Sequence, residues 1–171
     1  MKIKLEKLVF AAMMTALSVV IGLVCKTYFT FGAVRITFEN VPIILSGMIL
    51  NPVYGAVVGI ASDLVSAPLS GFGVNPVITL GSASVGFVGG LVFKLLPKSK
   101  KLVLTVCSVM SAHIVGSMIV KSLGLLMYSY PIQSILLRVP LYTAIGIAES
   151  YIIFCILKNK AISKFSEEVK K

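Results

Sequence analysis

The sequence predicts an all-α integral membrane protein whose single domain, residues 1–171, is a bundle of six transmembrane helices. Mean hydropathy is +1.01 and 57% of the residues are hydrophobic. Only 13% are charged, whereas a soluble domain carries about 25%. Apolar runs also recur between short polar segments, and about 20 apolar residues cross a bilayer.

The positions of the lysines predict how the bundle is oriented. A net charge of +10 would suggest nucleic acid as the partner of a soluble protein. Here all but four of the cations cluster within residues 2–7, 94–101 and 158–171, which an even number of spans separates; Lys26, Arg35, Lys121 and Arg138 fall elsewhere. By the positive-inside rule, both termini, the loop near residue 98 and the short polar tail 158–171 are cytoplasmic. We therefore expect the lipid bilayer as the environment and no nucleic acid.

The first predicted helix covers residues 5–25 and carries Ala12 and Ala16 four residues apart. Small residues at this spacing let another helix approach closely. The pattern fits packing within the bundle and docking onto a partner equally well. Residues 26–40 follow as a predicted external loop, because they combine charges with aromatic side chains between two apolar runs.

Five further helices are predicted from the remaining apolar runs. Turn signals such as Asn51-Pro52 and Asn75-Pro76 separate them. The predicted helices cover residues 41–50, 53–68, 77–96, 102–126 and 132–157. The segments 70–76 and 128–131 are predicted external loops.

Few titratable residues fall inside these helices: Asp63, His113, Lys121, Arg138 and Glu149. An ionised side chain at mid-bilayer costs about 2.5–3.5 kcal/mol, so it tends to face a cavity, a partner or the interface. Asp63, Lys121 and Arg138 fall in the outer halves of their predicted helices. These halves face the predicted loop that contains Arg35. This placement predicts one polar pocket that opens to the outside, with Asp63 and Arg35 serving binding.

For the other titratable residues inside the predicted helices, a structural role is an alternative to ligand binding. We expect Lys121 to extend to the outer interface, and His113 to be a hydrogen-bonded packing residue. Glu149 is expected to stay unpaired. For Arg138, an ion pair with Asp63 or Glu39 is as good an expectation as ligand binding.

Catalytic and metal-binding patterns are absent from the sequence. It contains no GxSxG, HExxH, Walker A or GxGxxG motif. One histidine without a nearby nucleophile makes no triad, and three scattered cysteines favour neither a metal site nor disulfides. We therefore expect no enzyme activity, no cofactor and no metal, and any active transport needs an energising partner.

Four motifs carry a resemblance to a known family. They are RITFxxVPIILSGM (residues 35–48), PVxGAxVGxASDL (52–64), NPxxTL (75–80) and LLRVP (136–140). The chain resembles the substrate-binding S components of energy-coupling factor (ECF) transporters over residues 7–157, and most of all the folate-specific group. It departs from that group at Glu39-Asn40, where a glycine is usual, and at residues 75–80, where Pro-Gly-Phe-Thr-Leu is usual.

The resemblance implies a six-helix S component in the multi-pass cell membrane of a prokaryote. Its vitamin enters from outside, into a pocket roofed by the loops after the first and third helices. Ala12 and Ala16 match a face that docks onto a transmembrane coupling subunit, which carries two cytoplasmic ATPase subunits.

Folate chemistry suits the polar residues of the matched motifs. One carboxylate, Asp63, can accept two hydrogen bonds from the pterin edge, while Arg35 and Arg138 can bind the glutamate carboxylates. Phenylalanine or tyrosine can stack on the flat rings. The candidate substrate-binding residues are Arg35, Phe38, Asp63, Asn75, Thr79, Ser82, Arg138 and Tyr142.

Two alternatives remain open at this point. The vitamin can be another one, such as pantothenate, a queuosine precursor or a thiamine precursor; an anionic ligand without a ring would use Arg35 but leave Asp63 idle. The chain can also be a membrane bundle protein without a transport role.

Overall fold

The computed structural model describes residues 2–31, 34–71, 73–97, 100–127 and 131–170. Besides short connecting segments, the described chain consists of helices and one antiparallel hairpin, which pairs Thr30 with Arg35 and Phe31 with Val34. Its elements in order are α1 (Lys2–Tyr28), β1 (Thr30–Phe31), β2 (Val34–Arg35), α2 (Asn40–Ile49), α3 (Pro52–Leu69), α4 (Pro76–Leu95), α5 (Lys101–Ala112), π-helical η1 (His113–Val120), α6 (Lys121–Leu126), α7 (Ile132–Leu136), α8 (Arg138–Lys158) and α9 (Lys160–Lys170).

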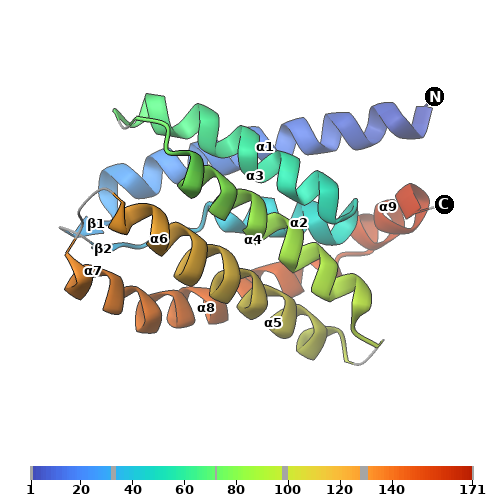
Figure 1. The fold of residues 1–171 in the computed structure, drawn as a ribbon. Coiled ribbons are helices and arrows are strands. Elements are labelled where there is room, and N and C mark those ends of the chain that lie inside the picture. Colours follow the sequence, from blue (N-terminus) through green and yellow to red (C-terminus); the bar gives the residue numbers. More distant parts are fainter. Residues whose placement is uncertain (1, 32–33, 72, 98–99, 128–130, 171) are drawn as a thin grey trace.

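The helices run roughly parallel to one long axis (Figure 1). α4 lies at the centre, in contact with α2 and α3 on one side and with α5, η1 and α6 on the other. The hairpin lies at one end of the bundle, which we call the hairpin end. Both termini and the turn between α4 and α5 lie at the opposite end, the termini end.

Five helical stretches are long and apolar enough, by length and composition, to cross a membrane: Leu5–Tyr28, Pro52–Leu69, Pro76–Leu95, Lys101–Leu126 and Ile135–Lys158. Of the six predicted membrane-spanning helices, these five are candidate spans in the structure. The expected second span is only α2, whose 10 residues extend about 15 Å, half of a hydrocarbon core of about 30 Å.

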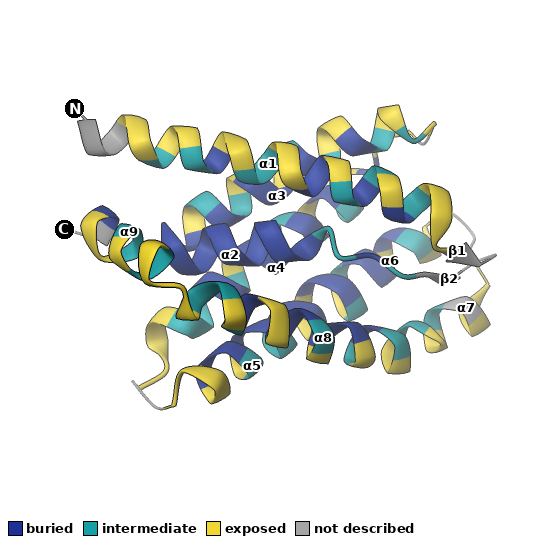
Figure 2. Cartoon of the chain, turned by 180° about the vertical axis from the view of Figure 1, so that it is seen from behind, coloured by how far each residue is buried: buried dark blue, intermediate teal, exposed yellow. Residues whose placement is uncertain are grey.

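α2 occupies the interior of the bundle. All of its residues are buried, and Figure 2 shows it in dark blue in the middle of the view, between α1 and α8. An extended segment, residues 36–38, leads into it from the hairpin. The segment between the hairpin and α3 is therefore part non-helical backbone and part helix, and protein encloses the helix.

Glycines let α2, α3 and α4 meet backbone to backbone. A Cβ added to Gly86 of α4 would collide with the Gly55 carbonyl of α3, and one on Gly59 would collide with the backbone of Ser82. On α2, a Cβ at Gly47 would collide with the Gly86 carbonyl. Gly55 and Gly59 therefore form a face of α3 on which α4 approaches closely.

Two predicted helices have irregular interiors. Residues 102–126 form one continuous rod, but its middle is the π-helical η1, a rare form that is frequent at functional sites. Residues 132–157 are divided at Leu137 into α7 and α8. Pro140 explains the division, because its ring lacks an N–H and clashes with the carbonyl four residues earlier, that of Leu136.

The tail after residue 158 is a helix, α9, and not simply a polar extension. Ile162, Phe165 and Val169 share one side of it and pack on the core. The Phe165 ring lies 5.1 Å from that of Phe10 in α1, and Val169 is 1% exposed. The tail therefore closes the termini end of the bundle.

Candidate functional site

Asp63 of α3 and Thr79 of α4 are joined across the seam between their helices. The Thr79 hydroxyl donates to Oδ2 of Asp63 at 2.6 Å. No other hydrogen bond reaches the carboxylate from the described residues, so Oδ1 stays available. Asp63 is half-buried, which leaves a carboxylate positioned by its neighbour and open to a second partner.

A small cavity of about 10 Å³ borders Asp63. This is about the volume that one water molecule needs. Its other lining residues are polar except for one: Ser18, Glu39, Ile43, Ser62, Ser66 and Ser82. The Ser62 hydroxyl is buried and has no hydrogen-bond partner in the described part of the chain. The cavity therefore gathers carboxylates and hydroxyls from α1, α3, α4 and the residue before α2.

Glu39, which lines this cavity, also forms an ion pair with Lys121. Nζ of Lys121, in α6, lies 3.9 Å from Oε1 of Glu39. Gly81 and Gly22 make room for this pair: a Cβ at Gly81 would collide with the Lys121 stem, and one at Gly22 would lie 2.6 Å from Oε2 of Glu39.

The expectation that Lys121 extends to the outer interface is therefore wrong. The residue is 7% exposed, because a glycine gap in α4 admits its stem and a carboxylate awaits its ammonium group. Lys26 also reaches inward, from the last turn of α1, and donates to the Ser66 hydroxyl at 3.2 Å. That last turn was predicted as loop.

A second buried pair joins α8 to η1. Nε2 of His113 lies 2.7 Å from Oε2 of Glu149, and both side chains are 0% exposed. Nδ1 of His113 lies 3.2 Å from the Ser117 hydroxyl. His113 is thus hydrogen-bonded as expected, whereas the expectation that Glu149 is unpaired is wrong, since η1 turns the histidine towards it.

Arg138 and Tyr142 lie next to this pair at the start of α8. Nη2 of Arg138 donates to the Ser117 carbonyl at 3.2 Å, and the guanidinium lies over the Tyr142 ring, 5.0 Å from its centroid. The Tyr142 ring lies 5.7 Å from that of His113.

The alternative that Arg138 pairs with Asp63 or Glu39 does not hold in the structure. Within the described residues no carboxylate reaches its guanidinium, and its Nε has no partner. Arg138 is therefore a half-buried cation whose charge is not neutralised.

The other predicted binding residues are placed differently. Asn75 caps α4 by accepting from the Val77 N–H at 2.9 Å, and its amide nitrogen donates to the Gly124 carbonyl at 3.3 Å. Phe38 packs against the apolar core. The backbone of Arg35 belongs to β2, but its side chain lies outside the described part of the structure.

Ala12 and Ala16 are both exposed on α1. Ala11 and Ser18 on the same helix are buried. The pair therefore faces away from its own bundle, so packing within the bundle does not account for it, and docking stays a prediction.

Several interior polar residues were not among the predicted binding residues. Asn40, at the start of α2, is 0% exposed, and neither its amide oxygen nor its amide nitrogen has a partner among the described atoms. Glu39 stands beside it. The sequence signal for these two residues was an acid and an amide directly before an apolar run. Burial of both groups is costly unless each has a hydrogen-bonding or charged partner.

The chain was compared with known families and proteins. A family model described as "ECF transporter, substrate-specific component" matches residues 6–160, which is most of the chain. No curated protein sequence matches.

Proposed function

Because this chain belongs to the family of substrate-specific components of ECF transporters, we propose that its vitamin is folate and that it captures folate from outside the cell. The family supports a vitamin transporter role, with a coupling subunit and ATPases as partners. The identity of the vitamin as folate goes beyond the family, and it rests on the residues that would bind folate.

The observation that carries the folate proposal is the uncompensated Arg138. A guanidinium without a carboxylate partner among the described residues is suited to a bidentate contact with a ligand carboxylate. Folate has two such groups in its glutamate moiety. The same bundle also presents Asp63 with Oδ1 available, and this carboxylate can accept from the pterin edge while Thr79 holds Oδ2.

The site is closed in this structure. The cavity beside Asp63 has about 10 Å³, whereas ligand pockets commonly have roughly 300–1,000 Å³. Folate binding therefore requires the segment around Glu39 to move. The ion pair between Glu39 and Lys121 is the contact that such a movement would break.

The charge distribution supports an orientation for this site. The termini end carries the three lysine clusters, so we place it in the cytoplasm. The hairpin end then faces outward, in a multi-pass protein of a prokaryotic cell membrane. In this arrangement the chain passes the membrane six times, with α2 and residues 36–38 as the second pass.

Binding of radiolabelled folate to the purified protein tests the proposal. Hydrogen bonds to charged groups contribute about 1.5–3 kcal/mol each. We therefore expect Arg138→Ala, Arg35→Ala and Asp63→Asn each to weaken binding by roughly 10- to 100-fold. Lys158→Ala is the control, because Lys158 is exposed at the termini end. Wild-type affinity in all three variants would remove the proposed site.

Competition separates folate from other vitamins. Pantothenate and precursors of queuosine and thiamine should fail to displace labelled folate at concentrations that unlabelled folate needs. If an anionic ligand without a ring is the true substrate, Arg138→Ala will impair its binding and Asp63→Asn will not. A bundle protein without a transport role would bind none of them tightly and would not co-purify with ATPases.

A further inference from the structure

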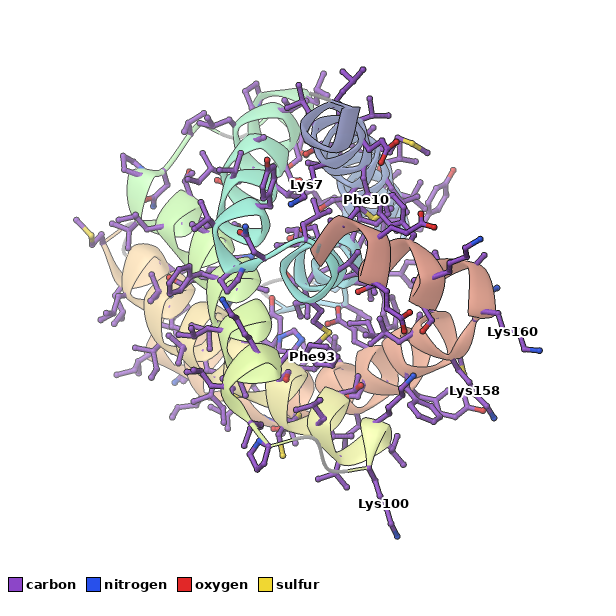
Figure 3. All side chains as sticks on the ribbon, turned by 90° about the vertical axis from the view of Figure 1, so that its right-hand side faces the viewer. Lys7, Phe10, Phe93, Lys100, Lys158 and Lys160 are labelled. Carbon is purple, nitrogen blue, oxygen red and sulfur yellow. The ribbon has the colours of Figure 1, made fainter. Side chains whose placement is uncertain are left out.

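A large cavity lies at the termini end, away from the site proposed for the vitamin. Its volume is about 860 Å³, within the range of small-molecule sites. The end of α2, the start of α3, the end of α4 and the start of α5 line it, and α9 borders it. Figure 3 looks onto this end of the bundle.

The polar part of this cavity is cationic. Lys7 of α1, Lys94 of α4 and Lys101 of α5 line it, together with one carboxylate, that of Glu167. No carboxylate of the described chain pairs with any of the three lysines. The lining therefore has an excess of two positive charges, and the hydroxyls of α9 add further hydrogen-bond donors.

Lys7, at the cavity, is oriented differently from three lysines outside it. Lys7 lies among the helices in Figure 3, whereas Lys100, Lys158 and Lys160 extend outward from the same end. Lys7 is half-buried, whereas Lys94 and Lys101, like the other three, are exposed. Membership of the cavity lining thus separates Lys7, Lys94 and Lys101 from a second set of lysines beside it.

The rest of the lining is apolar except for Asn51 and Thr105. Phe93, Leu104 and Leu157 belong to it. A free inorganic anion would leave this apolar wall in contact with water, whereas a lipid would cover it with its glycerol and first acyl carbons. The lysines also stand at the ends of membrane-spanning helices, the depth at which phospholipid phosphates lie.

We propose that this cavity binds the phosphate headgroup of an anionic phospholipid from the adjacent leaflet. Basic pockets between transmembrane helices are suited to such headgroups. The three ammonium groups would contact the phosphate, and the apolar wall would contact the lipid body. This site does not depend on which vitamin is carried, so each proposal can fail without the other.

Native mass spectrometry of the full chain in neutral detergent tests the site. The protein is titrated with dioctanoyl phosphatidylglycerol, with dioctanoyl phosphatidylcholine and with inorganic phosphate. We expect one phosphatidylglycerol to bind per chain, at least tenfold more tightly than phosphatidylcholine, and inorganic phosphate not to compete. Equal binding of both lipids, competition by inorganic phosphate at matching concentration, or no binding would each overturn the proposal.

Charge variants locate the binding. Each lysine near a headgroup contributes about a fivefold affinity, so Lys7→Gln, Lys94→Gln and Lys101→Gln combined should weaken phosphatidylglycerol binding about 100-fold. Glu167→Gln should strengthen it, by up to about fivefold. An unchanged affinity in Glu167→Gln together with an unchanged triple variant would place the lipid elsewhere.

A matched triple variant removes the same charge outside the cavity. Lys100→Gln, Lys158→Gln and Lys160→Gln combined should keep the affinity within about twofold. An equal loss in both triple variants would show general attraction to a basic surface and would overturn the site. Thermal unfolding of both proteins checks that the loss does not come from misfolding.

Discussion

Replacing Lys121 tests whether the ion pair with Glu39 holds the hairpin end closed. The two charged atoms are 3.9 Å apart, and the side chains are 9% and 12% exposed. At an effective dielectric constant of about 20, such a pair attracts by about 4 kcal/mol, most of which the loss of hydration offsets. Removing one partner leaves a charge buried, which typically costs about 3–5 kcal/mol.

We expect Lys121→Met to lower the free energy of unfolding by about 3 kcal/mol. Glu39 makes further interactions, so Glu39→Gln alone does not isolate the pair. The double variant leaves no unpaired charge and should recover about 1–3 kcal/mol of the summed single losses.

Unfolding by titration with sodium dodecyl sulfate, followed by circular dichroism, measures all four proteins of this cycle. Lys158→Met is the control, since substitution at an exposed site changes stability by at most about 0.5 kcal/mol. Additive losses, with a coupling energy below about 0.5 kcal/mol, would refute the idea that Glu39 and Lys121 depend on each other.

Three other outcomes follow from the packing. Gly86→Ala should lower stability by about 1–3 kcal/mol or more in the same titration, because its Cβ would meet the neighbouring backbone; wild-type stability would contradict the close approach of α3 and α4. Glu149→Leu should cost about 1–3 kcal/mol by leaving Nε2 of His113 unpartnered, and Glu149→Gln should cost less, since the amide still reaches the ring; equal losses would argue against the hydrogen bond. Ala12→Leu with Ala16→Leu should leave stability unchanged and reduce co-purification with a coupling subunit, and full co-purification would place the docking face elsewhere.

Local signals in the sequence predicted the helix boundaries well. Both Asn-Pro pairs start helices as expected, because the asparagine oxygen accepts a hydrogen bond from the first turn and proline lacks an N–H there: Asn51 accepts from Tyr54 and Asn75 from Val77. The spacing of Ile162, Phe165 and Val169 also indicates an amphipathic helix. The tail was nevertheless predicted only as a polar extension, because most of its residues are polar.

Pairings between distant segments could not be predicted. Lys121 turns inward because Gly81 leaves space beside it, and no local pattern reports the space that a glycine leaves on a neighbouring helix. The pairing of Glu149 with His113 could not be predicted either. His113 begins a π-helical stretch, and an apolar sequence does not indicate where a helix becomes π-helical. The candidate site was therefore predicted as a set of polar residues, and not as the contacts that join them.

The extended segment before α2 sets the direction in which the hairpin end can open. Within residues 36–38, Ile36 donates its backbone N–H to the Phe29 carbonyl at 3.1 Å, and Phe38 accepts from the Val41 N–H at the start of α2 at 3.1 Å. Displacing the segment therefore breaks backbone hydrogen bonds that need replacement. Hydrocarbon offers no replacement for backbone hydrogen bonds, which makes a sideways exit into lipid costly. Water does offer one. The segment can therefore rise along the long axis of the bundle into the aqueous phase, as a lid and not as a lateral door.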